Sequence, residues 1–199
     1  MTRFRRAEVD EEFQRMWALG SVGEQWTDWA QLFTPDVHYH DPFWGPLHGR
    51  EEVDLWINAV MKGVPEIYSV YDWHTIDDDV VVFHYQNRRD NPHHDGPEYW
   101  DFAGLSTVWY AGDGLWRAEE DYWDRDGARR TSADYAAACA RAGVTDPVER
   151  MTRRHWGAAP SWVRSDAEPH PTWLDRPELP AVTRPSQISA LLGRPRDAA

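Results

Sequence analysis

The feature that most constrains the fold is a change in the spacing of apolar residues near Glu66. Before this point, apolar side chains recur every three or four residues, the period of a helix with one buried face. After it, they alternate with polar residues, which is typical of strands. Helices first and strands afterwards predict an α+β domain, in which the helices pack on one face of a curved antiparallel sheet.

Three helices are expected in the first third of the chain. Residues 8–19 are predicted to form an amphipathic helix, and residues 26–33 a shorter one that ends in a turn at residues 34–36. A short strand over residues 37–42 follows. Acidic residues open the third helix and a Lys-Gly pair closes it, which predicts a helix over residues 50–63.

Four strands follow the helices as two long hairpins. They are predicted over residues 67–76, 80–88, 98–110 and 115–124. The pair Asp113-Gly114 lies between the last two strands and is a strong hairpin signal.

The chain changes character again near its C-terminal quarter. Residues 131–142 are predicted to form a helix, with Thr131 and Asp134 at the spacing of a capping box. From about Asp146 onward, prolines and scattered tryptophans predict an irregular arm that packs on its own domain or on a partner subunit. We therefore divide the chain into a domain over residues 1–130 and a helix with an arm over residues 131–199.

Charge and composition exclude several classes of function. The net charge is −13, and basic residues form no stripe, so binding to the phosphate backbone of a nucleic acid is disfavoured. No stretch approaches the roughly 20 apolar residues that a membrane-spanning helix needs, and the first residues do not resemble a signal peptide. A single cysteine, Cys139, fits a reducing compartment, so we expect a cytoplasmic protein that binds no membrane.

The chain contains thirteen tryptophans, an unusual number for its length. Most are expected in the core or at a subunit interface, because large aromatic side chains dominate both. The remainder could line a pocket for a flat, apolar ligand.

Three segments resemble the nuclear transport factor 2-like superfamily, and within it the SnoaL-like polyketide cyclases. They are LFTPDVHYHDPFWGPLHGREEVDLWI, the hairpin YAGDGLW, and EEDYWD in the last predicted strand. The resemblance covers roughly residues 8–127. It implies a cone-shaped half-barrel that encloses a pocket and a homodimer formed through the open sheet face. Proteins of this fold include cyclases, isomerases, dehydratases, epoxide hydrolases and non-catalytic binding proteins.

The resemblance implies that Asp121 is the principal acid or base. A carboxylate inside an aromatic cone has a raised pKa and can exchange a proton near neutral pH. Strand alternation places Glu119, Asp121 and Trp123 on one face. Residues Glu120 and Tyr122 lie on the other face, and the sequence alone does not decide which face points inward.

Three further residues are candidates for catalysis. Asp41, which ends the first predicted strand, matches the early carboxylate of ketosteroid isomerase-like proteins, although an Asp before a proline is also a common turn residue. Asp101 lies in an aromatic strand, where it could donate a proton to an oxyanion or pair with Arg88 or Arg117. An Arg between two aspartates would instead indicate epoxide hydrolysis.

His84 is the third candidate, as a proton relay beside Tyr85. His38 and His40 share one strand face, but no third residue has the spacing of a metal ligand, so no metal site is predicted. The motifs of phosphate-binding loops and of Ser or Cys nucleophiles are absent, so no cofactor is expected.

The leading hypothesis is a cofactor-independent acid–base enzyme that binds a small hydrophobic or polycyclic molecule. Its reaction would be a cyclisation, isomerisation, dehydration or epoxide opening. The alternative is a non-catalytic ligand-binding or dimeric interaction module of the same fold. Aromatic residues from both halves of the domain are expected to line the pocket: Trp17, Tyr39, Trp44, Trp56, Tyr85, Phe102 and Trp123.

Overall fold

The computed structural model describes residues 3–93, 95–146, 148–151 and 154–194. Three helices precede the long strands, as the sequence predicts. They are α1 (Arg6–Trp17), which continues into a π-helical turn (Ala18–Val22), α2 (Trp26–Ala30) and α3 (Arg50–Gly63).

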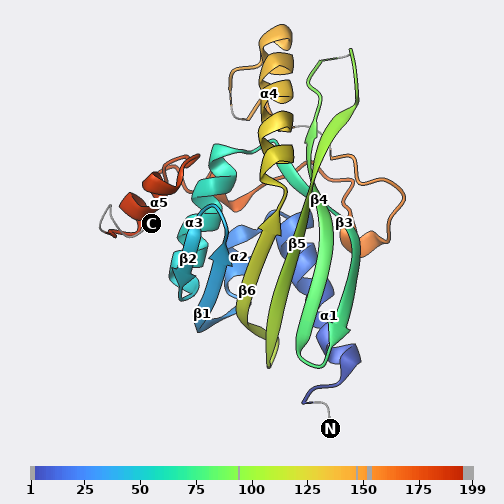
Figure 1. Ribbon diagram of the computed structural model, residues 1–199, viewed down its shortest axis with the longest axis vertical. Coiled ribbons are helices and arrows are strands. Elements are labelled where there is room, and N and C mark those ends of the chain that lie inside the picture. The colour runs from blue at the N-terminus through green and yellow to red at the C-terminus, as the bar shows by residue number, and fades with distance from the viewer. Residues whose placement is uncertain (1–2, 94, 147, 152–153, 195–199) are drawn as a thin grey trace.

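Six strands form one twisted sheet, and helices α1–α3 lie on one of its faces (Figure 1). The strands are β1 (Phe33–Asp41), β2 (Gly45–His48), β3 (Ile67–Asp77), β4 (Val80–Asp90), β5 (Tyr99–Gly112) and β6 (Leu115–Trp123). Their order across the sheet is β2-β1-β6-β5-β4-β3. The predicted α+β class and the two long hairpins are confirmed. The sheet is not wholly antiparallel, however, because β1 runs parallel to β6.

The limits predicted around the first strand were wrong. Residues 34–36, predicted as a turn, belong to β1, and so does Phe33, which was predicted to end the second helix. Residues 45–48 form the short strand β2, which was not predicted. Pro35 lies where the register between β1 and β6 is irregular, and the pairing of β1 with β2 begins only at His38. A proline is tolerated at such a point because it interrupts no regular ladder.

Helix α4 (Arg125–Ala142) begins six residues before its predicted start at Thr131. The helix is capped by Asp124, whose carboxylate accepts a hydrogen bond from the backbone N–H of Gly127 at 2.9 Å. A Cβ at position 127 would lie 2.3 Å from the Asp124 carboxylate, so glycine leaves room for this cap. Glycine is a poor helix former, which is why the sequence pattern hides the first turn.

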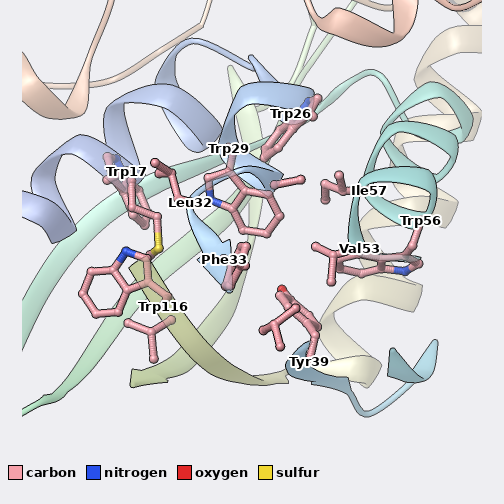
Figure 2. Packing of buried hydrophobic residues seen from close by; sticks show 14 of the residues in the cluster. Trp17, Trp26, Trp29, Leu32, Phe33, Tyr39, Val53, Trp56, Ile57 and Trp116 are labelled. Atoms are coloured by element: carbon pink, nitrogen blue, oxygen red, sulfur yellow. The ribbon is translucent and has the colours of Figure 1, made fainter. Parts of the chain in front are cut away.

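The core fills the space between the three helices and the sheet. Tryptophans form much of it, and Figure 2 shows Trp29 and Trp56 beside Phe33 and Tyr39. The rings of Trp29 and Phe33 meet edge to face, with centroids 4.8 Å apart. This packing holds the helices over the inward face of the sheet.

The C-terminal arm passes around the β3 edge of the sheet. Trp156 packs on Tyr68 and Val70, which belong to the outward face of β3. A few residues later, Trp162 packs against Phe13 of α1 and Tyr71, with its ring centroid 4.8 Å from that of Tyr71. The arm contains two short 3-10 helices (Ser161–Val163 and Thr172–Asp175) and helix α5 (Pro185–Leu191).

The arm then crosses the back of helix α3. The backbone N–H of Val182 donates to the carbonyl of Ala59 at 2.9 Å. A Cβ added to Gly63 would lie only 2.1 Å from the carbonyl oxygen of Val182, so the arm and the helix meet backbone to backbone at this glycine.

A buried ion pair joins the arm to the turn after α1. The guanidinium of Arg154 donates to Glu24 Oε1 at 3.1 and 2.7 Å, and each side chain is only 2% exposed. Burial raises the pKa of Glu24, while the charge of Arg154 and its hydrogen bonds lower it. The arm is therefore built into the interior of the domain.

Candidate active site

A cavity of about 1010 Å³ lies between the helices and the inward face of the sheet. Strand alternation decides which side chains reach it. On β1, Tyr39 and Asp41 are buried and their neighbours His38 and His40 are exposed. On β6, Glu119 and Asp121 are buried, while Glu120 and Tyr122 are exposed. The face of β6 that the sequence left undecided is thus the one that carries Asp121.

Asp121 lies at the centre of a hydrogen-bond network inside the cavity. Tyr39 donates its hydroxyl to Asp121 Oδ2 at 2.6 Å, and Ser106 donates to Oδ1 at 2.5 Å. The hydroxyl of Tyr85 lies 3.2 Å from that of Ser106 and extends the network to β4. Four strands therefore converge on one carboxylate.

A glycine sets the position of Tyr85. The ring of Tyr85 crosses β5 directly over Gly104, and a Cβ at that position would lie 2.5 Å from two ring carbons. Any larger residue would push the ring off the strand. Gly104 thereby directs the Tyr85 hydroxyl toward Ser106, two residues further along the same face of β5.

Asp41 accepts three hydrogen bonds at the end of β1. The backbone N–H groups of Phe43 and Trp44 donate to Oδ1 at 2.7 and 2.8 Å, and the indole of Trp123 donates to Oδ2 at 3.0 Å. Burial raises the pKa of Asp41, and these three donors oppose the rise. Asp41 thus has both roles considered from the sequence, since it organises the turn and also lines the cavity.

Glu119 is a further buried carboxylate that lines the cavity, and it was not among the predicted site residues. Its exposed fraction is 4%, close to the 4% of Asp41 and the 6% of Asp121. Its Oε2 has no hydrogen-bond partner among the residues that the structure describes. The alternation that pairs Glu119 with Asp121 was the available signal. We call Asp41, Glu119 and Asp121 the carboxylate cluster.

The pKa values of Asp121 and Glu119 are both raised in this cluster, by burial and by a neighbouring carboxylate. Burial and the charge of Asp41 raise the pKa of Asp121 to about 7, while hydrogen bonds from Ser106 and Tyr39 oppose the rise. Burial and the charge of Asp121 raise the pKa of Glu119 well above its ordinary value. Neighbouring carboxylates in an apolar site cannot all ionise together. Glu119 therefore keeps its proton to higher pH than an ordinary glutamate, and Asp121 can release or accept a proton near neutral pH.

Three further polar residues line the cavity beyond Tyr85, and none of them was among the predicted site residues. Asn87 and Arg89 follow Tyr85 on the inward face of β4, and Ser132 of α4 faces the same cavity. The terminal nitrogens of Arg89 donate to the hydroxyls of Thr131 and Ser132 at 2.8 and 3.0 Å. Because α4 was predicted to begin only at Thr131, a contact between its first turns and a pocket could not be foreseen.

Comparison with known proteins places this site in a family. The sequence model of the SnoaL-like domain matches residues 11–120, more than half of the chain. The chain belongs to the SnoaL-like domain family. None of the curated proteins matches the chain significantly.

Solved structures show the same fold over the matched region. A candidate SnoaL-like polyketide cyclase from Jannaschia sp. CCS1 has a TM-score of 0.50 and 18% identity over 63% of this chain and 91% of its own. A nuclear transport factor 2-like protein from Anabaena variabilis ATCC 29413 has a TM-score of 0.50 and 17% identity over 64% and 96%. The protein TerC, co-crystallised with polyporic acid, has a TM-score of 0.50 and 14% identity over 62% and 96%. At these identities the likeness establishes the fold alone.

The aromatic residues predicted to surround the pocket of this SnoaL-like domain do line the cavity. They come from α1, α3, four of the strands and the turn after β1, and they are Trp17, Tyr39, Trp44, Trp56, Tyr85, Phe102 and Trp123. Their role in binding a substrate stays a prediction.

Asp101 and His84 lie outside the cavity of the SnoaL-like domain. Asp101 pairs with Arg88 through two hydrogen bonds of 2.8 and 2.7 Å on the outward face of the sheet. His84 Nδ1 lies 2.8 Å from Asp72 on the same face. The structure therefore gives both residues a cross-strand partner rather than a place at the carboxylate cluster. Dimerisation through this outward face stays a prediction.

In the described part of the chain, no group of three or more His, Cys, Asp or Glu side chains is arranged to hold a metal ion. No helix within the same residues is long and apolar enough to cross a membrane.

The raised pKa of Asp121 means that this group is harder to ionise in the folded protein than in the unfolded chain. Asp121 should therefore reduce the stability of the folded protein at high pH, where it must ionise. Between its ordinary value of 3.8 and about 7, the folded state binds more protons, so wild-type stability falls as pH rises through this window and then levels off. Asp121→Asn removes the cost. We compare the free energy of unfolding of the variant with that of wild type. The difference in favour of the variant should be about 2 kcal/mol larger at pH 8 than at pH 5. Urea unfolding at both pH values measures this difference, and an equal effect at both would contradict it.

Proposed function

We propose that this protein is a cofactor-independent enzyme that moves protons on a small apolar or polycyclic substrate. One observation carries the proposal: Asp121 is buried, has a pKa of about 7, and faces an aromatic cavity of about 1010 Å³. A carboxylate whose pKa lies near the working pH is suited to general acid–base catalysis. Perturbed pKa values of this kind gather at functional sites.

The roles within the carboxylate cluster follow from its protonation. Ionised Asp121 is the base that removes a proton from the substrate. Protonated Glu119 is the acid beside it. Burial favours its protonated form, so it can donate the proton to negative charge that develops on the substrate. Tyr39 remains protonated, because burial and the charge of Asp121 raise its pKa well above the ordinary value. Its hydroxyl holds Asp121 in position.

Cyclisation, isomerisation and dehydration all require such a proton transfer. The epoxide-hydrolase interpretation needed an arginine between two aspartates at the site. The candidate pair, Arg88 and Asp101, lies on the outward face of the sheet. We therefore propose proton transfer at carbon or at a carbonyl oxygen rather than epoxide opening.

The test is hydrogen exchange into flat ketones and phenols supplied in deuterated water. TerC, a protein of similar fold, was co-crystallised with polyporic acid, which supports a choice of flat, oxygen-bearing probes. Asp121 acts as a base only when ionised, so the exchange rate should rise with pH up to about 7 and then remain constant. Nuclear magnetic resonance of the probe follows the exchange. A rate that is independent of pH between 5 and 9 would contradict the proposal.

A non-catalytic binding module is the alternative, and the size and aromatic lining of the cavity favour it. Binding without exchange would support this alternative. In that case, Asp121→Asn should change affinity only, through the hydrogen bonds that Asp121 offers to the ligand.

A further inference from the structure

The cavity has a basic end as well as an acidic one. On β4, Arg89 lies four residues beyond Tyr85, a distance of about 13 Å along an extended strand. Asn87 lies between them on the same inward face, and all three side chains line the cavity. A ligand long enough to touch both ends would meet the carboxylate cluster at one end and a guanidinium at the other.

The guanidinium of Arg89 is held in a fixed orientation. The hydroxyls of Thr131 and Ser132 both donate to the carbonyl of Ala128, at 3.1 and 2.7 Å. Their oxygen atoms can therefore only accept from Arg89, at 2.8 and 3.0 Å. Arg89 is only 4% exposed, so these contacts form in a largely dry environment.

The positive charge of Arg89 is only partly balanced by its neighbours. Its Nε lies 3.4 Å from Glu66 Oε1, but Glu66 also pairs with Arg150 at 3.0 Å. One carboxylate thus serves two cations. A buried charge without full compensation is costly, which indicates that an additional anion completes the group.

Arg89 also retains hydrogen-bond donors that have no acceptor among the residues that the structure describes. A guanidinium has five N–H groups, and three of those on Arg89 donate to described residues. The side chain of Asn87 lines the same cavity and is only partly buried, so its amide is accessible to a ligand. A planar carboxylate is the acceptor that best matches the forked donors of an arginine.

The geometry points to Arg89 and Asn87 as the binding site for a carboxylate group on the substrate. This inference rests on the proposed function for one point only, that the opposite end of the same molecule is the reacting end. The carboxylate cluster would repel an anion, so the acidic group of the substrate is directed to Arg89 and the apolar rings lie toward Asp121. The substrate class is then a flat, apolar acid, oriented in one direction.

The experiment compares two probes with the same rings, anthraquinone-2-carboxylate and the neutral anthraquinone-2-carboxamide, in which an N–H2 group replaces one carboxylate oxygen. Quenching of tryptophan fluorescence at pH 8 reports the affinity of each. Wild type should bind the carboxylate at least tenfold more tightly than the amide. Arg89→Gln should abolish this preference and leave the affinity for the amide within about twofold, whereas Arg89→Lys should retain part of it.

A control variant comes from the same helix that borders the site. Arg141 of α4 is about half-exposed and pairs with Asp95 at 3.7 Å, outside the cavity, so Arg141→Gln should leave both affinities unchanged. Loss of Arg89 leaves Glu66 paired with Arg150, so the Arg89→Gln protein is expected to fold. If it does not fold, Asn87→Leu carries the test and should reduce the carboxylate preference at least threefold.

Equal affinities for the two probes in wild type would overturn the inference, as would an equal weakening of both probes by Arg89→Gln. An unchanged preference in Asn87→Leu, where that variant carries the test, would overturn it as well. Hydrogen exchange distinguishes failure of this inference from failure of the proposed function. A carboxylate preference without exchange would reject the enzyme and keep the Arg89 site. Exchange that depends on Asp121, without any carboxylate preference, would keep the enzyme and reject the Arg89 site.

Discussion

Asp121→Asn should lower the rate of proton exchange by about a thousandfold, within the range that general acid–base groups contribute. Asparagine keeps the size of the side chain and can still accept a hydrogen bond from Tyr39 or Ser106, so the cavity should keep its shape. It cannot take up a proton from carbon. We therefore expect the affinity for a flat ketone to stay within about threefold of wild type, since the catalytic loss falls on the transition state alone.

The matched control is the residue that precedes Asp121 on β6. Glu120→Gln makes the same chemical change on the exposed face of β6, so it should leave the exchange rate unchanged. Glu119→Gln should also lower the rate, but by less than Asp121→Asn, because the amide cannot transfer a proton yet is neutral and can still donate a hydrogen bond to a developing negative charge. Rates are measured by single-turnover exchange in deuterated water. A tenfold or smaller loss in Asp121→Asn would remove this residue from the centre of the mechanism.

Arg154→Met should destabilise the folded protein by about 3–5 kcal/mol, because it leaves Glu24 buried without its cation. The loss includes hydrogen bonds from Arg154 to the backbone carbonyls of Pro65 and Glu66, at 3.1 and 3.5 Å. The same guanidinium lies over the ring of Tyr68, 4.6 Å from its centroid, so packing is lost as well. Urea unfolding at neutral pH measures the difference in free energy.

Two further variants separate charge from packing at this ion pair. Arg164→Met alters an exposed arginine ten residues along the arm and should cost less than about 0.5 kcal/mol. Glu24→Gln combined with Arg154→Met removes both charges and should recover about half of the loss. A loss below about 1 kcal/mol in the single Arg154 variant would show that the arm contributes little to the stability of the domain.

The sequence predicts the fold well because periodicity and turn chemistry are local signals. The buried face of α1, the limits of α3 and the hairpin at Asp113-Gly114 follow directly from neighbouring residues. The start of α4 does not, because a glycine in its first turn disguises a helix that Asp124 caps. The parallel pairing of β1 with β6 joins segments about 80 residues apart, and no local pattern carries that information.

The site was partly predictable for the same reason. Asp121 was selected by resemblance, and its neighbour Glu119 shares a strand face with it, but the inward face is set by the distant partners Tyr39 and Ser106. Asp101 was considered both as a proton donor and as a partner of Arg88 or Arg117, and the structure shows the pairing with Arg88. Arg88 lies opposite Asp101 on the adjacent strand, and that register cannot be read from one sequence. Arg89 was missed because its contacts come from α4.

The backbone contact between Gly63 and Val182 ties a residue of the SnoaL-like domain to the path of the arm. The glycine lies within the residues that the family model matches, whereas the valine lies beyond them. Any side chain at position 63 would meet the carbonyl of Val182, so the arm would have to move away from α3. The arm therefore restricts which residue this domain can carry at the end of α3.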